Sequence, residues 1–264
     1  MLFRSAEPQA YGDPAVCGGA FAFGYVHHFV DAALGKADAV KQLARYYSQA
    51  RPTMATFVSN HDKFAGQRLW DQVQGDETRY KLAAAGYLLQ PGTPFIYYGE
   101  EVGQGGVNTL EGDSPLRAPM SWTADPTRAG FTTGQPFRPV APNVATHNAA
   151  AQLRDPQSIY HFYKSMLALR NTRSSIARGS FEHAFAKGLV LGFQRVWGSQ
   201  RSLVLINYGT QAAEVKVPGV SGATTWTPLW ASQGASPRVP PVPSGSGEPI
   251  LNLPAQSVQV FDLR

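Results

Sequence analysis

The stretch MATFVSNHD, residues 54–62, decides the fold class that this chain is expected to adopt. It is a short run of apolar, β-forming residues that ends in a His-Asp pair. This order places two ionisable side chains at the carboxyl end of a strand. In α/β barrels the catalytic groups lie at that end of the strands. The stretch therefore makes His61 and Asp62 candidates for contact with a substrate, although the pair taken alone is explained as well by a strand-end His and a helix-capping Asp.

Helices and further strands alternate around this stretch. Apolar spacing predicts helices at residues 38–48 and 77–90, the first capped by Asp38 and the second ended by Pro91 and Gly92. The other predicted elements are a strand at 2–6, a strand leading into a helix at 20–34, strands at 53–59 and 94–98, and a helix at 158–172. Strands and helices that alternate at this spacing form βα units and predict a parallel sheet.

The pattern changes beyond residue 174. A long loop rich in Gly and Pro, residues 99–157, precedes the last predicted helix, and loops of this length are usually functional. Short β-rich runs separated by turn residues then follow at 189–196, 203–207, 214–217 and 257–263. Such runs are typical of an antiparallel β-sandwich. We therefore divide the chain into an α/β domain, residues 1–175, and an antiparallel β-sandwich domain, residues 176–264.

Composition excludes several classes of function. The chain has 264 residues and a formal net charge of +5, but its 23 basic residues are scattered, which argues against a nucleic-acid partner. No apolar run is long enough to cross a membrane, and the first residues lack the features of a signal peptide, so a cytoplasmic location is expected. Cys17 is the single cysteine, which rules out a disulfide within the chain, and it is expected to be a small buried residue.

Several long motifs occur in one order and together resemble a known family. FVSNHD, residues 57–62, resembles the FVxNHD motif of the α-amylase family, glycoside hydrolase family 13. LLQPGTPFIYYGEEVG, residues 88–103, resembles the last barrel strand of that family and the loop after it. LRAPMSW, AGFTTGQPFRPV and NVATHNAAAQLRDPQSIYHFYKSMLALRN are similar to its oligo-1,6-glucosidase and α-glucosidase branch. The matches cover roughly residues 7–178.

The resemblance implies a fold that is only partly present. Residues 1–175 correspond to the second half of a (β/α) TIM-type barrel, and residues 176–264 to the C-terminal β-domain. A closed barrel of this type needs eight strands. An incomplete barrel leaves sheet edges open, and open edges pair with other chains, so a homo-oligomer through that edge is expected.

The resemblance also implies an activity and a set of site residues. It implies a retaining α-glucan hydrolase whose substrates are starch or malto-oligosaccharides. Asp62 would stabilise the oxocarbenium-like transition state, His61 would bind sugar hydroxyls, and Asn60 would fix the turn that aims both. Glu7, in SAEPQAY, matches the general acid/base, and Arg68 matches a basic residue that follows the motif. Calcium is the ion that the family implies, and no other cofactor is indicated.

Aromatic residues near the strand ends are candidates for stacking on sugar rings. They are Phe64, Trp70, Tyr97, Tyr98, Trp122 and Phe131. Core packing is the alternative for at least half of them. His27 and His28 are adjacent on a predicted helix and are expected to point in different directions, so they are not expected to form a metal-binding pair.

The nucleophile of the family has no match in the sequence. The family pattern is GFRxDAxxH, and the nearest segment is HFVDAA, residues 28–33, with Phe29 where the arginine is needed. We expect Asp31 in that segment to be a helix-surface residue, and Glu100 and Glu101 to be loop-edge carboxylates bonded to backbone. Two functions therefore remain open: an α-glucan hydrolase, or a catalytically impaired remnant that binds carbohydrate without cleaving it.

Overall fold

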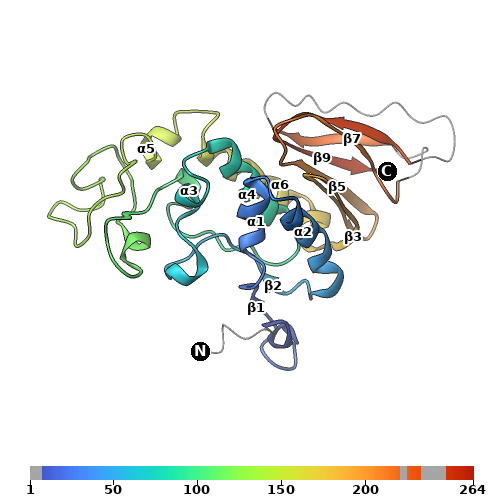
Figure 1. Cartoon of the computed structure of the whole chain (residues 1–264), viewed down its shortest axis with the longest axis horizontal. Coiled ribbons are helices and arrows are strands. Elements are labelled where there is room, and N and C mark those ends of the chain that lie inside the picture. Colours follow the sequence, from blue (N-terminus) through green and yellow to red (C-terminus); the bar gives the residue numbers. More distant parts are fainter. Residues whose placement is uncertain (1–7, 221–224, 233–247) are drawn as a thin grey trace.

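The computed structural model describes residues 8–220, 225–232 and 248–264 (Figure 1). The predicted strand at 2–6 and Glu7 lie outside the described residues. The helices are α1 (His27–Ala33), α2 (Ala37–Gln49), α3 (Leu69–Gln72), α4 (Glu77–Leu89), α5 (Ala149–Gln152), α6 (Ile159–Thr172) and α7 (Ser174–Arg178). The strands are β1 (Ala20–Phe21), β2 (Met54–Ala55), β3 (Ser180–Lys187), β4 (Val190–Trp197), β5 (Gln200–Asn207), β6 (Ala213–Lys216), β7 (Trp226–Ala231), β8 (Ile250–Leu253) and β9 (Ser257–Leu263). Short 3-10 turns are η2 (Pro8–Gly12), η3 (Lys63–Ala65), η4 (Glu100–Val102) and η5 (Ser114–Arg117).

The parallel part of the fold is short and open. β1 pairs with β2 in parallel, and an isolated parallel bridge joins Thr56 to Pro94. This confirms the predicted βα order, but the predicted strand at 53–59 shrinks to two residues and that at 94–98 to the single bridge. The parallel segments form part of a barrel and carry α1, α2 and α4 between and after them.

An apolar pocket lies beside these parallel strands. It has a volume of about 640 Å³, and Phe21, Phe23 and Phe95 are among the residues that line it. Phe95 is exposed. Cys17 also lines this pocket and is exposed, so the expectation that it is buried was wrong. Pairing of two copies through this open side remains a prediction.

The first turns of α4 and α2 are capped differently. α4 is capped by Asp76, whose carboxylate accepts a hydrogen bond from the backbone N–H of Arg79 at 3.0 Å. The predicted cap of α2 was wrong, because Lys36 occupies the cap position and the Asp38 carboxylate instead bonds to Lys41 Nζ at 2.9 Å. A side chain at position 38 already lies inside the helix, where it cannot fold back onto the free N–H groups.

α4 is the central helix of the core. Every residue from 82 to 89 is buried, so the helix is enclosed on all sides along this stretch. Gly86 permits this, because a Cβ there would lie 3.0 Å from both Phe29 of α1 and the Tyr208 hydroxyl. α6 packs beside α4 with its predicted apolar face buried: Ile159, Phe162, Tyr163, Met166 and Leu169. The Ser158 side chain caps α6 by accepting a bond from the His161 N–H.

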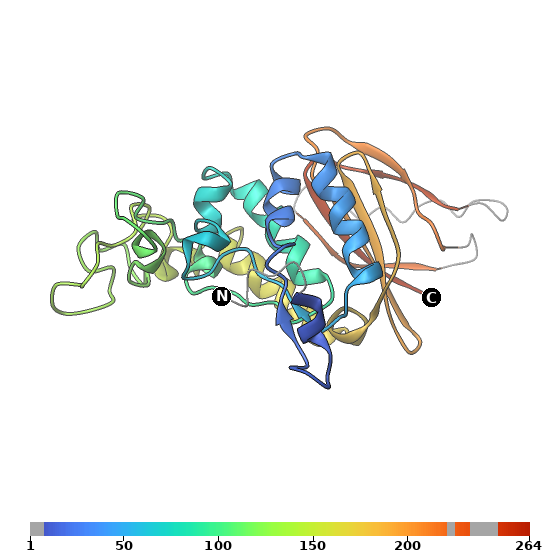
Figure 2. The same ribbon diagram turned by 60° about the horizontal axis from the view of Figure 1, so that its bottom comes forward.

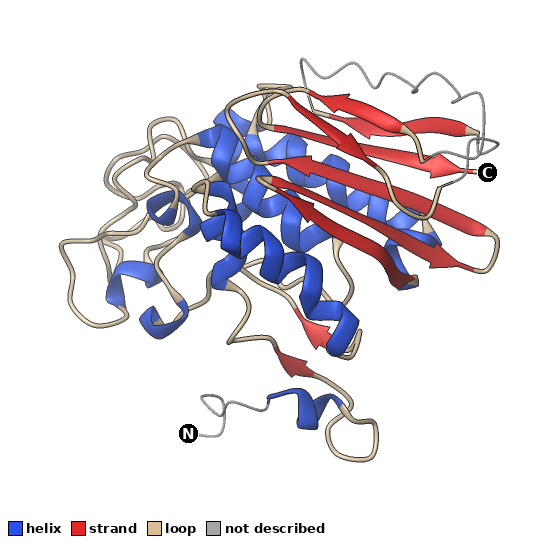
Figure 3. Cartoon of the chain, turned by 45° about the vertical axis from the view of Figure 1, so that its right-hand side comes forward, coloured by secondary structure: helices blue, strands red, loops and turns tan. Residues whose placement is uncertain are grey.

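The C-terminal part is antiparallel, as predicted. Five strands pair in the order β3-β4-β5-β9-β7, and β6 pairs with β8 in a second sheet of two strands. The helices cover one face of the larger sheet (Figure 3). Alternate residues divide between the two faces: Phe193 and Val204 pack against the helices, whereas Leu203 and Leu205 pack against the two-stranded sheet. A sandwich of two full sheets is not confirmed, because the second sheet has only β6 and β8 and helices cover the opposite face of the larger sheet.

Two buried arginines join the sheet to the helical part. Arg170 of α6 donates to the carbonyl oxygens of Leu88 and Gln90, and Arg195 of β4 donates to that of Leu89 at 2.9 Å. Burial and the neighbouring Arg170 lower the pKa of Arg195. These bonds satisfy the last carbonyls of α4, which the helix itself leaves free. The core therefore continues across the predicted domain boundary at residue 175, which falls inside α7.

The long segment 99–157 extends from the helices on the side away from the antiparallel sheet (Figure 2). It contains only η4, η5 and α5, which agrees with the predicted loop. Over the described parts of the chain, no helix combines the length and the apolar character needed to span a membrane.

Candidate active site

The turn after β2 carries three of the predicted site residues. Asn60 Oδ1 accepts a hydrogen bond from the backbone N–H of Asp62 at 2.8 Å, which closes an Asx turn. The side chain of His61 is 65% exposed and that of Asp62 is 32% exposed. His61 Nε2 lies 3.5 Å from Asp62 Oδ1. The turn thus presents an imidazole and a carboxylate side by side at the surface. Asn60 closes the turn that carries both, as expected from the sequence.

Arg117 holds this turn from the far side of the sequence. Its Nη2 lies 3.1 Å from Asp62 Oδ1 and 3.0 Å from Asp113 Oδ2, and its Nε donates to the carbonyl oxygen of His61 at 2.9 Å. Asp113 Oδ1 in turn accepts from the backbone N–H of Lys63 at 2.8 Å. The guanidinium therefore fixes one oxygen of Asp62 and leaves the other for a ligand.

Sequence reasoning missed Arg117 and Asp113. They lie four residues apart, Asp113 directly before η5 and Arg117 at its last position, a spacing that places opposite charges within reach of each other. That spacing was the available signal. It does not reveal the contact with Asp62, because 55 residues separate Arg117 from Asp62 along the chain.

Arg68, which the resemblance implies as a substrate-binding residue, is buried. Its side chain is 1% exposed, and its Nη atoms donate to the carbonyl oxygens of Tyr98 and Leu116 at 2.5 and 2.7 Å. Its guanidinium also lies 4.6 Å from the ring centres of Tyr97 and Tyr98. Arg68 is therefore not presented to a ligand in this structure, and it joins the turn after β2 to the segments at 98 and 116 from within.

The predicted aromatic residues fall into two groups. Tyr98 is exposed, its hydroxyl donates to the carbonyl oxygen of Ala118 at 2.6 Å, and the Arg68 guanidinium lies over its ring. Phe64, Trp122 and Phe131 are also exposed. Trp70 instead packs on His147 with ring centres 4.0 Å apart. Stacking on sugar therefore remains a prediction for Tyr98 and the three exposed rings.

Glu100 is a buried carboxylate at the end of the next barrel segment. It is 2% exposed and accepts hydrogen bonds from the hydroxyls of Tyr87 at 2.5 Å, Tyr163 at 2.7 Å and Ser59 at 3.1 Å. Burial raises the pKa of Glu100 to about 7, although these hydroxyls oppose the shift. The expectation of a loop-edge carboxylate bonded to backbone was wrong for Glu100, because the hydroxyl donors come from the strand end at 59, from α4 and from α6. It holds for Glu101, whose carboxylate is hydrogen-bonded to backbone.

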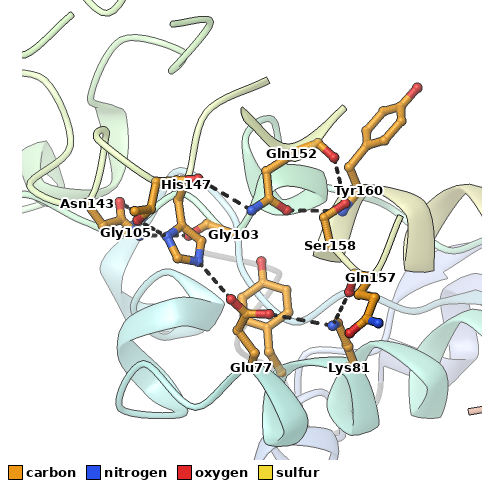
Figure 4. Close-up of polar contacts among 12 residues, drawn as sticks. Glu77, Lys81, Gly103, Gly105, Asn143, His147, Gln152, Gln157, Ser158 and Tyr160 are labelled. Carbon is orange, nitrogen blue, oxygen red and sulfur yellow. Dashed lines mark hydrogen bonds and ion pairs between the residues drawn. The ribbon is translucent and has the colours of Figure 1, made fainter. Parts of the chain in front are cut away.

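A polar network fastens the long loop to α4 near this region (Figure 4). His147 Nε2 lies 3.6 Å from Glu77 Oε1, and Thr146 Oγ1 lies 2.9 Å from His147 Nδ1. The hydrogen bond to His147 holds the pKa of Glu77 below its usual value. Asn143 bonds the backbone of Gly103 and Gly105, each at 2.9 Å. The network joins two distant parts of segment 99–157 to each other and to the helix.

One group of potential metal ligands converges among the residues that the structure describes. The ligand atoms of His27, His28 and Asp31 all lie within 4.8 Å of one another on α1. The expectation that the two histidines point in different directions was wrong, because their ring centres are 4.0 Å apart and Asp31 lies within reach of both. This nitrogen-rich set does not fit calcium, which prefers oxygen ligands. A calcium requirement therefore remains a prediction without a site in the described residues.

Comparison with known proteins extends these observations. The family model for the α-amylase catalytic domain matches residues 25–179, which include the Asn60–Asp62 turn, Glu100 and Arg117. The oligo-1,6-glucosidase of Parageobacillus thermoglucosidasius is 27% identical over 202 residues, which cover 61% of this chain and 35% of that protein. The trehalose synthase/amylase TreS of Mycobacterium tuberculosis is 30% identical over 208 residues, covering 75% of this chain and 34% of that protein.

Solved structures share the fold. The α-amylase from H. orenii has a TM-score of 0.71 at 22% identity, covering 92% of this chain and 48% of that one. The isomaltulose synthase SmuA from Protaminobacter rubrum has a TM-score of 0.67 at 21% identity, covering 87% and 46%. The chain thus spans about a third of the length of the curated relatives and about half of these structures. Because the family model matches more than half of its residues, the chain belongs to the α-amylase family.

Proposed function

We propose that this chain carries part of the site of a retaining α-glucan hydrolase that acts on malto-oligosaccharides. The observation that carries the proposal is the position of Asp62, which follows β2 and is bonded through one oxygen to Arg117 at 3.1 Å. The names of the relatives, an oligo-1,6-glucosidase among them, support a substrate built from α-linked glucose.

The free oxygen of Asp62 is the atom that would contact substrate. A retaining hydrolase distorts the sugar ring, and hydrogen bonds to ring hydroxyls that strengthen in the transition state lower the barrier. Asp62 can accept such bonds, because Arg117 occupies only Oδ1 among its contacts described above. The exposed His61 imidazole lies beside it and would bind a neighbouring hydroxyl. Tyr98 would supply an aromatic face.

Proton transfer in this proposal belongs to Glu7. In retaining hydrolysis one carboxylic acid protonates the leaving oxygen and later activates water, while a second carboxylate forms the covalent intermediate. Glu7 matches the first role by its sequence context, SAEPQAY. Neither Glu100 nor Asp31 suits the second role, because Glu100 is enclosed by three hydroxyls and Asp31 of α1 is paired with Lys36.

A second candidate function is sugar binding without cleavage. It is favoured by the lack of a match to the nucleophile motif in the sequence, since Phe29 stands where the motif needs arginine. Binding needs only the Asn60–Asp62 turn and Arg117, whereas cleavage also needs two carboxylates placed on either side of the bond. The two functions therefore differ in whether the glycosidic bond is cleaved, which can be measured.

The test uses the full chain with its mass verified, assayed with and without calcium. Release of reducing sugar from maltose, isomaltose and starch measures cleavage, and titration calorimetry with maltotriose measures binding. Turnover that is lost in both Glu7→Gln and Asp62→Asn supports the hydrolase. Binding that is lost in His61→Gln, with no turnover by the unmodified chain, supports the second function. If the folded chain neither cleaves maltose, isomaltose or starch nor binds maltotriose, both proposals fail.

A further inference from the structure

We propose that His27, His28 and Asp31 bind one divalent transition-metal ion of the zinc class on the outer side of α1. The ligand atoms of these residues lie within 4.8 Å of one another, and the two imidazole rings are 4.0 Å apart at their centres. The site lies outside the Asn60–Asp62 turn and does not rest on the proposed hydrolase function.

Helix geometry explains why two adjacent histidines converge. Residues one apart on a helix do not face each other, but residues three and four apart do. Asp31 stands four residues after His27 and three after His28, so its carboxylate lies within 4.8 Å of a ring nitrogen of each. The three side chains thus share one side of α1 and need only small rotations to reach a common ion. Zinc bonds of about 2.1 Å place tetrahedral ligand atoms roughly 3.4 Å apart.

The ligand types select the class of ion. Two imidazoles and one carboxylate suit zinc and the neighbouring first-row ions, and zinc completes such a set with water in the fourth position. Calcium and magnesium prefer sets made of oxygen. His27 is exposed, while His28 and Asp31 are half-buried, so an ion and its water can enter from solvent.

A cation already neutralises the carboxylate of this group. Lys36 Nζ lies 2.8 Å from Asp31 Oδ1, and the lysine side chain is 62% exposed. An exposed pair of this kind contributes little, so the ammonium can move into solvent when an ion binds. A pocket of about 460 Å³, lined by His28, Asp31, Lys36 and Asp38 among others, leaves room for the ion and for the displaced lysine.

The experiment uses the full chain without an affinity tag, stripped with chelator and titrated with zinc chloride by calorimetry. We expect one zinc per chain and a higher melting temperature with zinc present. His28→Gln and Asp31→Asn should each weaken zinc binding at least about tenfold, since loss of a mere supporting contact already costs about that much. Lys36→Gln should strengthen it, up to about fivefold, because it removes a competing ion pair worth at most about 1 kcal/mol.

Matched controls separate this site from adventitious binding. His161→Gln and Cys17→Ser remove an imidazole and a thiol elsewhere on the surface and should leave zinc affinity unchanged. Calcium and magnesium chloride should give no saturable heat. The proposal is overturned if the unmodified chain, shown to be folded by circular dichroism, binds no zinc. It is overturned equally if zinc binds with the same affinity in His28→Gln, Asp31→Asn and the unmodified chain.

Discussion

Two carboxylates stand at neighbouring strand ends in this molecule, and their surroundings differ completely. Asp62 follows β2, is partly exposed, and is paired with the guanidinium of Arg117. Glu100 follows the segment that bridges to Thr56 through Pro94, and it is enclosed by hydroxyl groups with its pKa raised to about 7 by burial. Position at the carboxyl end of a barrel strand is therefore not enough to assign a chemical role, because the immediate partners decide it.

The two carboxylates are also physically linked. Ser59 donates to Glu100 Oε2, and Ser59 directly precedes the turn that carries Asp62. Glu100 thereby fastens the strand end from inside, while Arg117 holds the turn from outside. In this account Glu100 is a positioning residue and Asp62 is the residue that meets the sugar.

The largest expected effect is on Asp62. Asp62→Asn keeps the shape of the side chain but removes the charge that stabilises the transition state, so any turnover should fall about 10³-fold. The measurement is reducing-sugar release, with the far-ultraviolet circular dichroism spectrum as the check on folding. Glu100→Gln is the matched variant and should retain most of the turnover at neutral pH. If Glu100→Gln loses more turnover than Asp62→Asn, Glu100 is the residue that acts on the sugar and Asp62 is not.

The second effect is on stability and concerns Glu100. Its pKa is raised from 4.5 to about 7 in the folded chain, so the folded state binds the proton more tightly than the unfolded state. This contribution to the free energy of unfolding is complete below about pH 4.5 and is lost as the pH rises to about 7. The loss amounts to about 3 kcal/mol at 1.36 kcal/mol per pKa unit.

Urea unfolding of the unmodified chain and of Glu100→Gln, compared at each pH from 4.5 to 8, isolates this contribution. The glutamine cannot ionise, so the difference in free energy between the two proteins should change by that amount over the stated interval and then level off. If the difference in free energy of unfolding does not change with pH, burial does not raise the pKa of Glu100.

The smallest effect is expected for Arg117. Its ion pairs with Asp62 and Asp113 are partly exposed, so Arg117→Gln should lower the free energy of unfolding by about 1 kcal/mol or less. Because the turn then loses its hold on Asp62, maltotriose binding should weaken severalfold by calorimetry. Arg128→Gln, on the same long loop and outside these contacts, serves as the control. If the unmodified chain, Arg117→Gln and Arg128→Gln bind maltotriose with equal affinity, Arg117 does not contribute to sugar binding.

The sequence predicts the local elements well because their signals are periodic. The apolar face of α6 and the strands that became β4, β5, β6 and β9 follow directly from spacing. β3, β7 and β8 are missed. β3 and β7 are the edge strands of the larger sheet, where β3 alternates poorly in burial and β7 contains Pro228, and β8 has only four residues. The predicted sandwich overlooked the helices, since a strand pattern shows that a face is apolar but not what covers it.

The candidate site is only half visible in the sequence. Asn60, His61 and Asp62 are adjacent, so one motif reveals them together. The partners of Glu100 come from positions 59, 87 and 163, and Arg117 reaches Asp62 across 55 residues. Contacts of that kind depend on tertiary packing, and no local pattern encodes them. The same limit applies to Arg68. Its position after the motif suggested contact with a substrate, but the side chain is buried and bonds to backbone carbonyl oxygens.

The most direct test of this contrast is a maltotriose titration of the isotope-labelled chain, followed by the NMR shifts of backbone amides. The account predicts saturable shifts centred on Asn60, His61, Asp62 and Arg117, with the amides of Tyr87 and Tyr163 around Glu100 nearly unchanged. Saturable shifts confined to the Glu100 surroundings or to the antiparallel sheet, with the turn at 60–62 unaffected, would contradict the assignment of that turn as the sugar-binding part of the molecule.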